Sequence, residues 1–116
     1  MNWTAIKTLE QLTTIVEISK TTPCVIYKHS TRCNTSEMMK YVLENDWQFE
    51  EDEVRPFYLD ILEYQDIAIT IADRFQVHHQ SPQILLIKNM ECTYDADNME
   101  ISIEELKESL ADNFWK

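Results

Sequence analysis

Glycine is absent from this sequence of 116 residues. Its absence excludes the glycine-rich loops that hold phosphates in nucleotide-binding proteins. Any backbone position with a positive φ angle must also use another residue, and Asn and Asp tolerate this conformation best. We therefore expect turns with positive φ at Asn89, which separates ILLIK from ECTYD, and in the segment DADN at 95–98.

Long apolar runs and basic residues are also scarce. No run approaches the length needed to cross a bilayer, and the segment MNWTAIKTLEQL lacks the basic start and apolar core of a secretion signal, so we expect a cytoplasmic protein. The 21 acidic residues outnumber the 10 basic ones, for a net charge of −11. This charge repels nucleic acids and anionic membranes, and we expect neither as a partner. The composition, with 44% hydrophobic residues, predicts one globular domain over 1–116.

Cysteine is present at three scattered positions, Cys24, Cys33 and Cys92. Their spacing does not match a zinc site and no Cys/His cluster accompanies them, so we expect no metal. In a reducing cytosol all three are expected to be free thiols. Cys24 begins an apolar strand and Cys92 lies in a predicted hairpin, so both are interpreted as structural. The sequence leaves open whether either reaches Cys33 to form a disulfide.

Local patterns predict alternating helices and strands, closed by a hairpin and a last helix. The predicted helices begin at the capping box Thr8–Gln11, near residue 33, before Ile67, and at a second capping box of Ser102 and Glu105. The predicted strands are CVIYK at 24–28, PFYLDIL at 56–62, and QILLIK and CTYD around Asn89, with a short strand near Trp3 to Ile6. Alternation favours parallel strands with right-handed crossovers, and the hairpin adds antiparallel ones.

The segment KHSTRCNTS places Cys33 between the end of a strand and the beginning of a helix. Unpaired N–H groups and the positive end of the helix dipole favour a thiolate there. Arg32 is adjacent, and Lys28 and His29 precede it, so positive surroundings are expected. Sites of open α/β sheets lie at the carboxyl ends of parallel strands. The pattern therefore favours a reactive Cys33, with an inert helix-start cysteine as the alternative.

Three residues after Cys33 stands Ser36 rather than a second cysteine. A serine can hydrogen-bond a thiolate or a leaving sulfur but cannot close a disulfide, so exchange chemistry must pass through a mixed disulfide that another molecule resolves. His78 and His79 precede Ser81, and a Cys/His hydrolase is conceivable. No third orienting group is recognisable, so hydrolase chemistry is disfavoured.

Two longer segments carry a family resemblance. YKHSTRCNTSEMM and IADRFQVHHQSPQILLIKN resemble the monothiol bacilliredoxins, a thioredoxin-like family of low-GC Gram-positive bacteria and some relatives. The resemblance extends from about Trp3 to the last helix, and KHS, Cys-x-x-Ser and SPQ are its most specific parts. It implies a thioredoxin-like α/β fold with a mixed central sheet of four to five strands and helices on both faces.

The resemblance also implies roles for single residues. Cys33 matches the redox-active cysteine, and Ser36 stands where a resolving cysteine would be. Pro82 matches the cis-proline beside the active thiol, and Ser81 matches the residue whose backbone receives an extended substrate. Cys33 is flanked by Arg32 and Asn34, where the family usually has Thr and Pro. These two residues are candidates for substrate binding, and they leave the preferred substrate open.

The function implied by the resemblance is the removal of bacillithiol from protein mixed disulfides. Bacillithiol is then a co-substrate, no cofactor is tightly bound, and the partners are bacillithiolated proteins and a low-molecular-weight thiol. We expect a monomer or weak dimer. A glutathione-type monothiol redoxin and a non-enzymatic, stress-associated binding module are the alternatives. The module would dock through the acidic loop NDWQFEEDEVR, although Trp47 and Phe49 in this loop are expected to pack inward.

Overall fold

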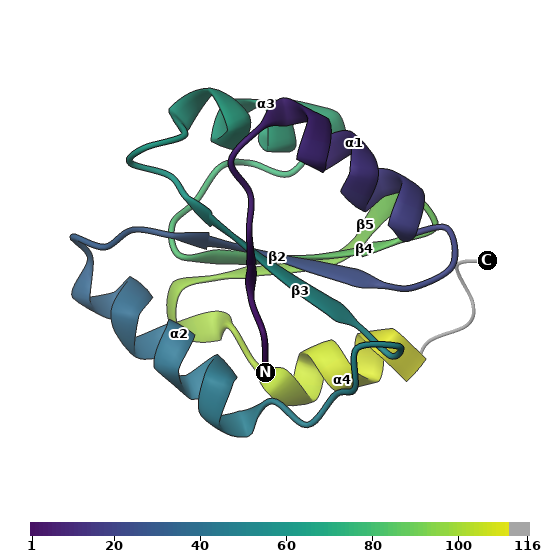
Figure 1. The fold of residues 1–116 in the computed structure, drawn as a ribbon. Coiled ribbons are helices and arrows are strands. Elements are labelled where there is room, and N and C mark those ends of the chain that lie inside the picture. Colours follow the sequence, from purple (N-terminus) through teal and green to yellow (C-terminus); the bar gives the residue numbers. More distant parts are fainter. Residues whose placement is uncertain (112–116) are drawn as a thin grey trace.

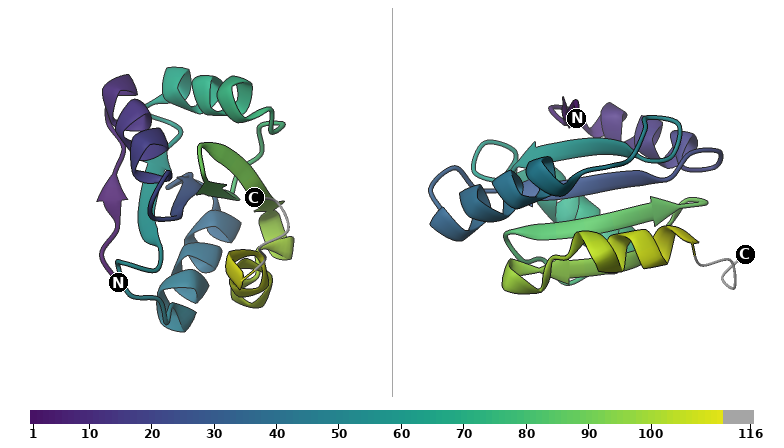
Figure 2. Two further views of the ribbon diagram at one scale, coloured as in Figure 1. Left: turned by 90° about the vertical axis from the view of Figure 1, so that its right-hand side faces the viewer. Right: turned by 90° about the horizontal axis from the view of Figure 1, so that it is seen from below.

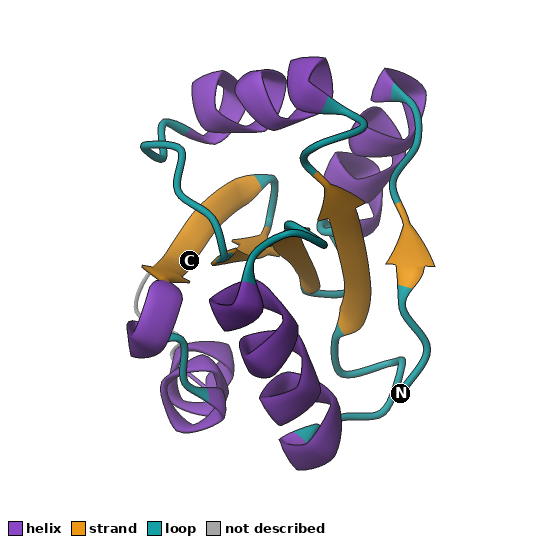
Figure 3. Ribbon diagram, turned by 90° about the vertical axis from the view of Figure 1, so that its left-hand side faces the viewer, coloured by secondary structure: helices purple, strands orange, loops and turns teal. Residues whose placement is uncertain are grey.

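The computed structural model describes residues 1–111, and these form a five-stranded mixed sheet between two layers of helices (Figures 1 and 3). The elements are β1 (Thr4–Ala5), α1 (Leu9–Ile18), β2 (Cys24–His29), α2 (Asn34–Asp46), β3 (Arg55–Asp60), α3 (Gln65–Phe75), β4 (Gln83–Lys88), β5 (Glu91–Asp97), the 3₁₀ turn η1 (Asn98–Glu100) and α4 (Ile103–Ala111). The predicted elements are all present, including the short N-terminal strand, and η1 is an addition.

The strand order is β1-β3-β2-β4-β5, so β2 lies at the centre. β1, β3 and β2 are parallel, whereas β4 and β5 are antiparallel to their neighbours. The views in Figure 2 show β1 at one edge of the sheet and β5 at the other. The prediction of parallel strands closed by an antiparallel hairpin is confirmed.

The predicted capping box is complete at α1, and at α4 the Ser102 side chain caps the helix as predicted. Thr8 is the N-cap of α1, and it exchanges hydrogen bonds with Gln11 as a full capping box. At α4 the Ser102 hydroxyl accepts a hydrogen bond from the Glu105 N–H at 3.3 Å. The Glu105 carboxylate accepts a second one from the Tyr94 hydroxyl at 3.1 Å, which ties the helix to β5.

Positive φ angles occur at Asn89 and Asn98, as predicted from the lack of glycine, and also at Met90 and Gln76. Asn89 and Met90 together make the two-residue turn between β4 and β5, and such turns with two positive φ angles match the twist of the strands. Gln76 takes the left-handed position at the C-terminus of α3, which glycine usually fills. Neither Met90 nor Gln76 was predicted, because their residue types carry no turn signal.

The core has two layers, one on each face of the sheet. On the α1 and α3 face, Ile15, Ile71 and their neighbours pack against Cys24 and Ile26 of β2. On the α2 and α4 face, Leu43 and Leu106 are among the residues that pack against Val25 and Tyr27. Every residue of β2 is buried, because both of its faces are covered. Each large apolar side chain buried in this way contributes about 1.5–3 kcal/mol.

The aromatic residues of the acidic loop belong to this core. Trp47 and Phe49 pack against the cluster on the α2 and α4 face, with their rings edge to face at 5.0 Å. The prediction that they point inward is confirmed. Within residues 1–111, no helix combines the length and apolar character that a membrane span requires.

Candidate active site

Cys33 is the N-cap residue of α2, directly beyond the carboxyl end of β2. Its backbone is held on both sides: its N–H donates to the Ser30 carbonyl at 3.2 Å, and its carbonyl accepts from the Glu37 N–H at 3.1 Å. The side chain is half-buried, and within the described part of the chain it makes no capping hydrogen bond. The backbone of Cys33 is therefore fixed on both sides, and no capping hydrogen bond from the described residues engages its sulfur.

The residues that flank Cys33 are exposed. Arg32 and Asn34 both face solvent, and the Arg32 N–H donates to the Ser30 hydroxyl at 3.4 Å. Lys28, in contrast, is fully buried on the face of α1 and α3, where its Nζ lies 3.2 Å from Nδ1 of His79. The expectation that Lys28 adds positive charge around Cys33 is wrong, because strand alternation sends it to the face opposite His29.

Ser36 is fully buried in the first turn of α2. Its hydroxyl oxygen accepts a hydrogen bond from the Ser30 N–H at 3.0 Å and lies 2.7 Å from Nδ1 of His29. Its carbonyl accepts from the Tyr27 hydroxyl at 2.8 Å. Burial is the main cause that raises the pKa of Tyr27, to about 12, so this phenol remains a donor at neutral pH. Ser36 thus lies at the centre of a buried hydrogen-bond network.

His29 is the part of this network that sequence reasoning treated only as a positive charge. It is buried, and its Nε2 lies 2.9 Å from the Glu37 carboxylate. Its ring stacks on the ring of Tyr27, with 5.9 Å between the two ring centroids. Period-2 alternation places Tyr27 and His29 on the face that receives α2, and this signal in the sequence could have indicated the contact with Ser36.

Ser81 and Pro82 lie at the same end of the sheet as Cys33. β4 is antiparallel to β2 with Gln83 opposite Lys28, so the residues just before β4 lie where β2 ends. The Ser81–Pro82 bond is cis, as the resemblance implied. The Ser81 hydroxyl oxygen is buried, and it has no hydrogen-bond partner among residues 1–111.

Cys24 and Cys92 lie at the far end of the sheet. Cys24 is opposite Ile87, and Ile87 is opposite Cys92. The six residues of β2 span about 20 Å, far more than the roughly 7 Å that limits a disulfide, so neither thiol is placed to resolve Cys33. Burial raises the pKa of Cys24 to about 11 and that of Cys92 to about 12. Both interpretations as structural cysteines agree with this placement.

A crevice opens beside the Cys33 loop. β2 continues into α2 on one face of the sheet, whereas its neighbour β3 continues into α3 on the other (Figure 1). Where connections leave in opposite directions, parallel sheets leave a crevice beyond their carboxyl ends. A cavity of about 440 Å³ occupies this point, and this volume is in the range of small-molecule sites.

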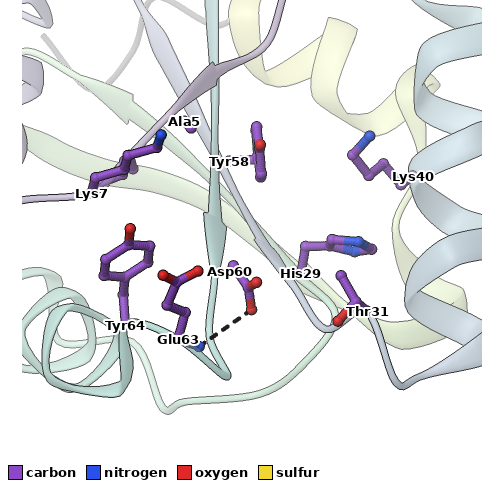
Figure 4. Close-up of a pocket in the computed structure, with 10 residues that line it drawn as sticks. Ala5, Lys7, His29, Thr31, Lys40, Tyr58, Asp60, Glu63 and Tyr64 are labelled. Carbon is purple, nitrogen blue, oxygen red and sulfur yellow. Dashed lines mark hydrogen bonds between the residues drawn. The ribbon is translucent and has the colours of Figure 1, made fainter.

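The walls of this crevice carry both signs of charge. Figure 4 shows Lys7, Glu63 and Tyr64 on one side, and His29, Thr31 and Lys40 on the other. Tyr58 and Asp60 from β3 lie between them. Of the residues that line the crevice, Thr31 is the nearest to Cys33 in the sequence, two residues before it. Sequence reasoning did not find the crevice, because its residues come from β1, β2, β3, α2 and the loops between elements.

Residues 4–106 match the family model of the monothiol bacilliredoxin BrxC. The chain belongs to the monothiol bacilliredoxin family. Because the match spans nearly the whole described chain, the bacilliredoxin resemblance stated from the sequence is confirmed.

Solved structures similar to this bacilliredoxin have the thioredoxin fold. A protein assigned as an oxidoreductase with a thioredoxin fold is 25% identical, with a TM-score of 0.78 over 91% of each chain. The thioredoxin Mala s 13 of Malassezia sympodialis is 17% identical, with a TM-score of 0.74 over 95% of this chain and 89% of that one. A thioredoxin of Trypanosoma brucei brucei is 14% identical, with a TM-score of 0.74 over 96% and 89%. The predicted thioredoxin-like fold is confirmed, and the family supports a thiol redox function.

Proposed function

We propose that this bacilliredoxin is a monothiol thiol-disulfide oxidoreductase that removes bacillithiol from protein mixed disulfides, with Cys33 as the nucleophile. The observation that carries the proposal is a contrast in place and acidity: Cys33 is half-buried at a helix start, whereas Cys24 and Cys92 lie at the far end of the sheet, where burial raises their pKa values to about 11 and about 12. Ser36 in place of a resolving cysteine requires that a second molecule completes the reaction.

The exchange is balanced without any further oxidant. The Cys33 thiolate attacks the bacillithiol sulfur, the bond between Cys33 and bacillithiol forms, and the bond to the substrate protein breaks. The protein thiolate leaves and takes a proton from water. A low-molecular-weight thiol, as its thiolate, or a reductase then attacks the Cys33 mixed disulfide and releases the Cys33 thiolate. If the attacking thiol is bacillithiol, the product is bacillithiol disulfide.

Four residues around Cys33 are proposed to contact the substrates. The backbone of Ser81, next to the cis Pro82, is proposed to receive an extended segment of the bacillithiolated protein. Arg32 and Asn34 are exposed on either side of the sulfur, so they can contact the same segment. An arginine here favours substrates that carry negative charge near the modified cysteine.

The crevice is proposed to receive the polar part of the low-molecular-weight thiol. The malate of bacillithiol carries carboxylates, which Lys7 and Lys40 can attract from opposite walls. Lys40 is already paired with Glu44 at 2.7 Å, so we assign Lys7 the larger part. Lys7→Glu is expected to raise, several-fold, the bacillithiol disulfide concentration needed for half-maximal rate. Lys20→Glu, on an exposed lysine outside the crevice, is the matched control and is expected to change nothing.

The central test is the adduct on Cys33. Reduced protein incubated with bacillithiol disulfide is expected to gain the mass of one bacillithiol, and peptide mapping is expected to place it on Cys33. Cys33→Ser is expected to abolish the adduct and the release of bacillithiol from a modified protein, whereas Cys92→Ser, the matched control, keeps both. A wild-type protein that stays unmodified would overturn the proposal.

The alternatives are separated by two further measurements. Parallel incubation with glutathione disulfide distinguishes a glutathione-type redoxin, which would form the glutathione adduct faster. A partner that is captured equally well by Cys33→Ser at moderate salt would indicate a binding module. Trp47 and Phe49 are partly buried against the core, which leaves such a docking loop less aromatic surface to offer.

A further inference from the structure

The buried network under α2 contains one proton whose position matters. Ser36 has a single hydroxyl proton, and its oxygen already accepts the Ser30 N–H at 3.0 Å. The second contact of this oxygen is Nδ1 of His29 at 2.7 Å. In a hydrogen bond between a hydroxyl and an imidazole nitrogen, either group can be the donor, so the state of His29 decides which one donates.

The other ring nitrogen of His29 determines the neutral state. Nε2 lies 2.9 Å from the Glu37 carboxylate, and a carboxylate only accepts, so Nε2 carries a proton. In the neutral ring Nδ1 is then an acceptor, and the Ser36 hydroxyl must donate to it. With its only proton turned toward His29, Ser36 has none to offer to a sulfur.

Protonation of His29 reverses this bond. Nδ1 then donates to the Ser36 oxygen, which accepts from both Nδ1 and the Ser30 N–H, and the hydroxyl proton is free to turn. Ser36 is at the third helical position and Cys33 is the N-cap, and the Cys33 side chain makes no capping hydrogen bond among residues 1–111. Side chains at these two positions can reach each other across the first turn of a helix. The Cys33 sulfur is the acceptor toward which this proton can turn.

We propose that His29 is a positioning residue whose protonation lets Ser36 donate a hydrogen bond to the Cys33 thiolate. The inference rests on Cys33 being the exchanging thiol. The negative charge lies on this sulfur when it attacks and again when it leaves, so the same hydrogen bond serves both halves of the exchange. No covalent bonds between heavy atoms change except the S–S bonds. The hydroxyl proton stays on Ser36, and His29 takes up its additional proton from solvent.

Charged and titratable groups face His29 from several elements. Its surroundings contain Glu37 and Lys40 of α2, Tyr27 of the same strand, Asp60 opposite it on β3, and Lys7, Glu63 and Tyr64 across the crevice. The nearest carboxylate, that of Glu37, favours the imidazolium. Lys40 opposes it, but Lys40 is paired with Glu44 at 2.7 Å. A thiolate on Cys33 also favours the imidazolium of His29, and by the same interaction the imidazolium favours the thiolate.

The test is a titration of the thiolate by its ultraviolet absorbance between about pH 4 and 9, where Cys24 and Cys92 stay protonated. His29→Asn keeps a polar group near Nδ1 but does not titrate, and it is expected to raise the midpoint by about one pH unit. Ser36→Ala is expected to raise it equally, and the double variant no further. His78→Asn, on an exposed histidine, is the matched control and is expected to keep the wild-type midpoint.

Other outcomes of the titration overturn the inference. An unchanged midpoint in His29→Asn would show that His29 does not act on Cys33. A shift in His29→Asn but not in Ser36→Ala would show that the charge acts directly through space and not through Ser36. A shift in the His78 control as large as that of His29→Asn would also contradict it. Urea unfolding of each variant verifies that it is folded.

A second measurement uses the wild-type chain and needs no variant. NMR of isotope-labelled His29 is expected to show the proton of the neutral ring on Nε2, and alkylation of Cys33 is expected to lower the pH at which His29 becomes protonated. A proton on Nδ1 of the neutral ring, or no response to alkylation, would overturn the inference. These measurements involve no disulfide. If the protein exchanges bacillithiol but these measurements do not give the expected results, the proposed function stands and the role of His29 is overturned. If the measurements give the expected results but no bacillithiol is exchanged, only the proposed function is overturned.

Discussion

Each face of β2 carries a basic side chain near the carboxyl end of the strand, but the two have opposite surroundings. On the α2 face, His29 has partners at both ring nitrogens, and it lies under the helix that Cys33 begins. On the other face, Lys28 is fully buried against His79, and its charge acts on Cys92. Lys28 and His29 are neighbours in the same strand, so their opposite surroundings can be compared directly.

The difference shows that a nearby cation is not enough to activate a thiol. Burial is the main cause that raises the pKa of Cys92, to about 12, although Lys28 acts in the other direction. Burial also lowers the pKa of Lys28 to about 8. Nearby, the Gln83 side-chain oxygen is buried and has no hydrogen-bond partner among residues 1–111. Loss of water therefore outweighs the attraction between charges on this face.

The largest effect expected from this comparison is on thiol reactivity. In the folded protein iodoacetamide is expected to modify Cys33 and to spare Cys24 and Cys92. A pKa raised from 9.0 to about 12 leaves Cys92 with about a thousandfold less thiolate than an ordinary cysteine. Mass mapping of peptides over time measures the three rates, and urea is expected to make all three thiols reactive. Equal modification of Cys92 and Cys33 in the folded state would break the comparison.

A smaller effect is expected when the buried cation is removed. Lys28→Met is expected to raise the free energy of unfolding at pH 7 by about 2 to 3 kcal/mol, because the folded state lowers the pKa of Lys28 from 10.5 to about 8. His79 is exposed, so water can replace the lost contact. Urea unfolding measures the change. Lys20→Met, on an exposed lysine paired with Glu17, is the control and is expected to change stability by less than about 0.5 kcal/mol.

The difference in the free energy of unfolding between Lys28→Met and the wild type is expected to depend on pH. Between about pH 8 and 10.5 the unfolded chain holds a proton on Lys28 that the folded chain has released. The stability of the wild type therefore gains from this residue as pH rises through the window, and Lys28→Met lacks that gain. The advantage of the variant is expected to shrink from pH 8 toward pH 10.5. Urea unfolding at several pH values that finds a constant advantage would contradict the assigned pKa.

The smallest effect concerns the network on the α2 face. Tyr27→Phe removes the hydroxyl that donates to the buried Ser36 carbonyl at 2.8 Å, and a loss of about 1 kcal/mol in the free energy of unfolding is expected. Tyr41→Phe, on an exposed tyrosine of the same helix layer, is the matched control, expected to be neutral. If both variants were equally stable by urea unfolding, the hydroxyl of Tyr27 would not contribute to the network.

Much of the local structure followed from short-range patterns. The capping residues Thr8 and Ser102 marked two helix starts, and apolar spacing marked the buried face of α3. The turn at Asn89 followed from the lack of glycine. The left-handed conformation of Gln76 did not, because glutamine carries no turn signal; its N–H donates to the Ala72 carbonyl at the C-terminus of α3.

From the sequence alone came the order of the elements, the family resemblance, the position of Cys33 at the start of a helix, and the serine in place of a second thiol. All of these depend on neighbours within a few residues or on the chain order. Only the tertiary structure decided which face Lys28 occupies, that His29 meets Ser36, and that the other two thiols lie at the far end of the sheet. These features depend on which helix covers each face of the sheet and on pairings between distant strands. The period-2 alternation of the strand indicates only that Lys28 and His29 lie on opposite faces.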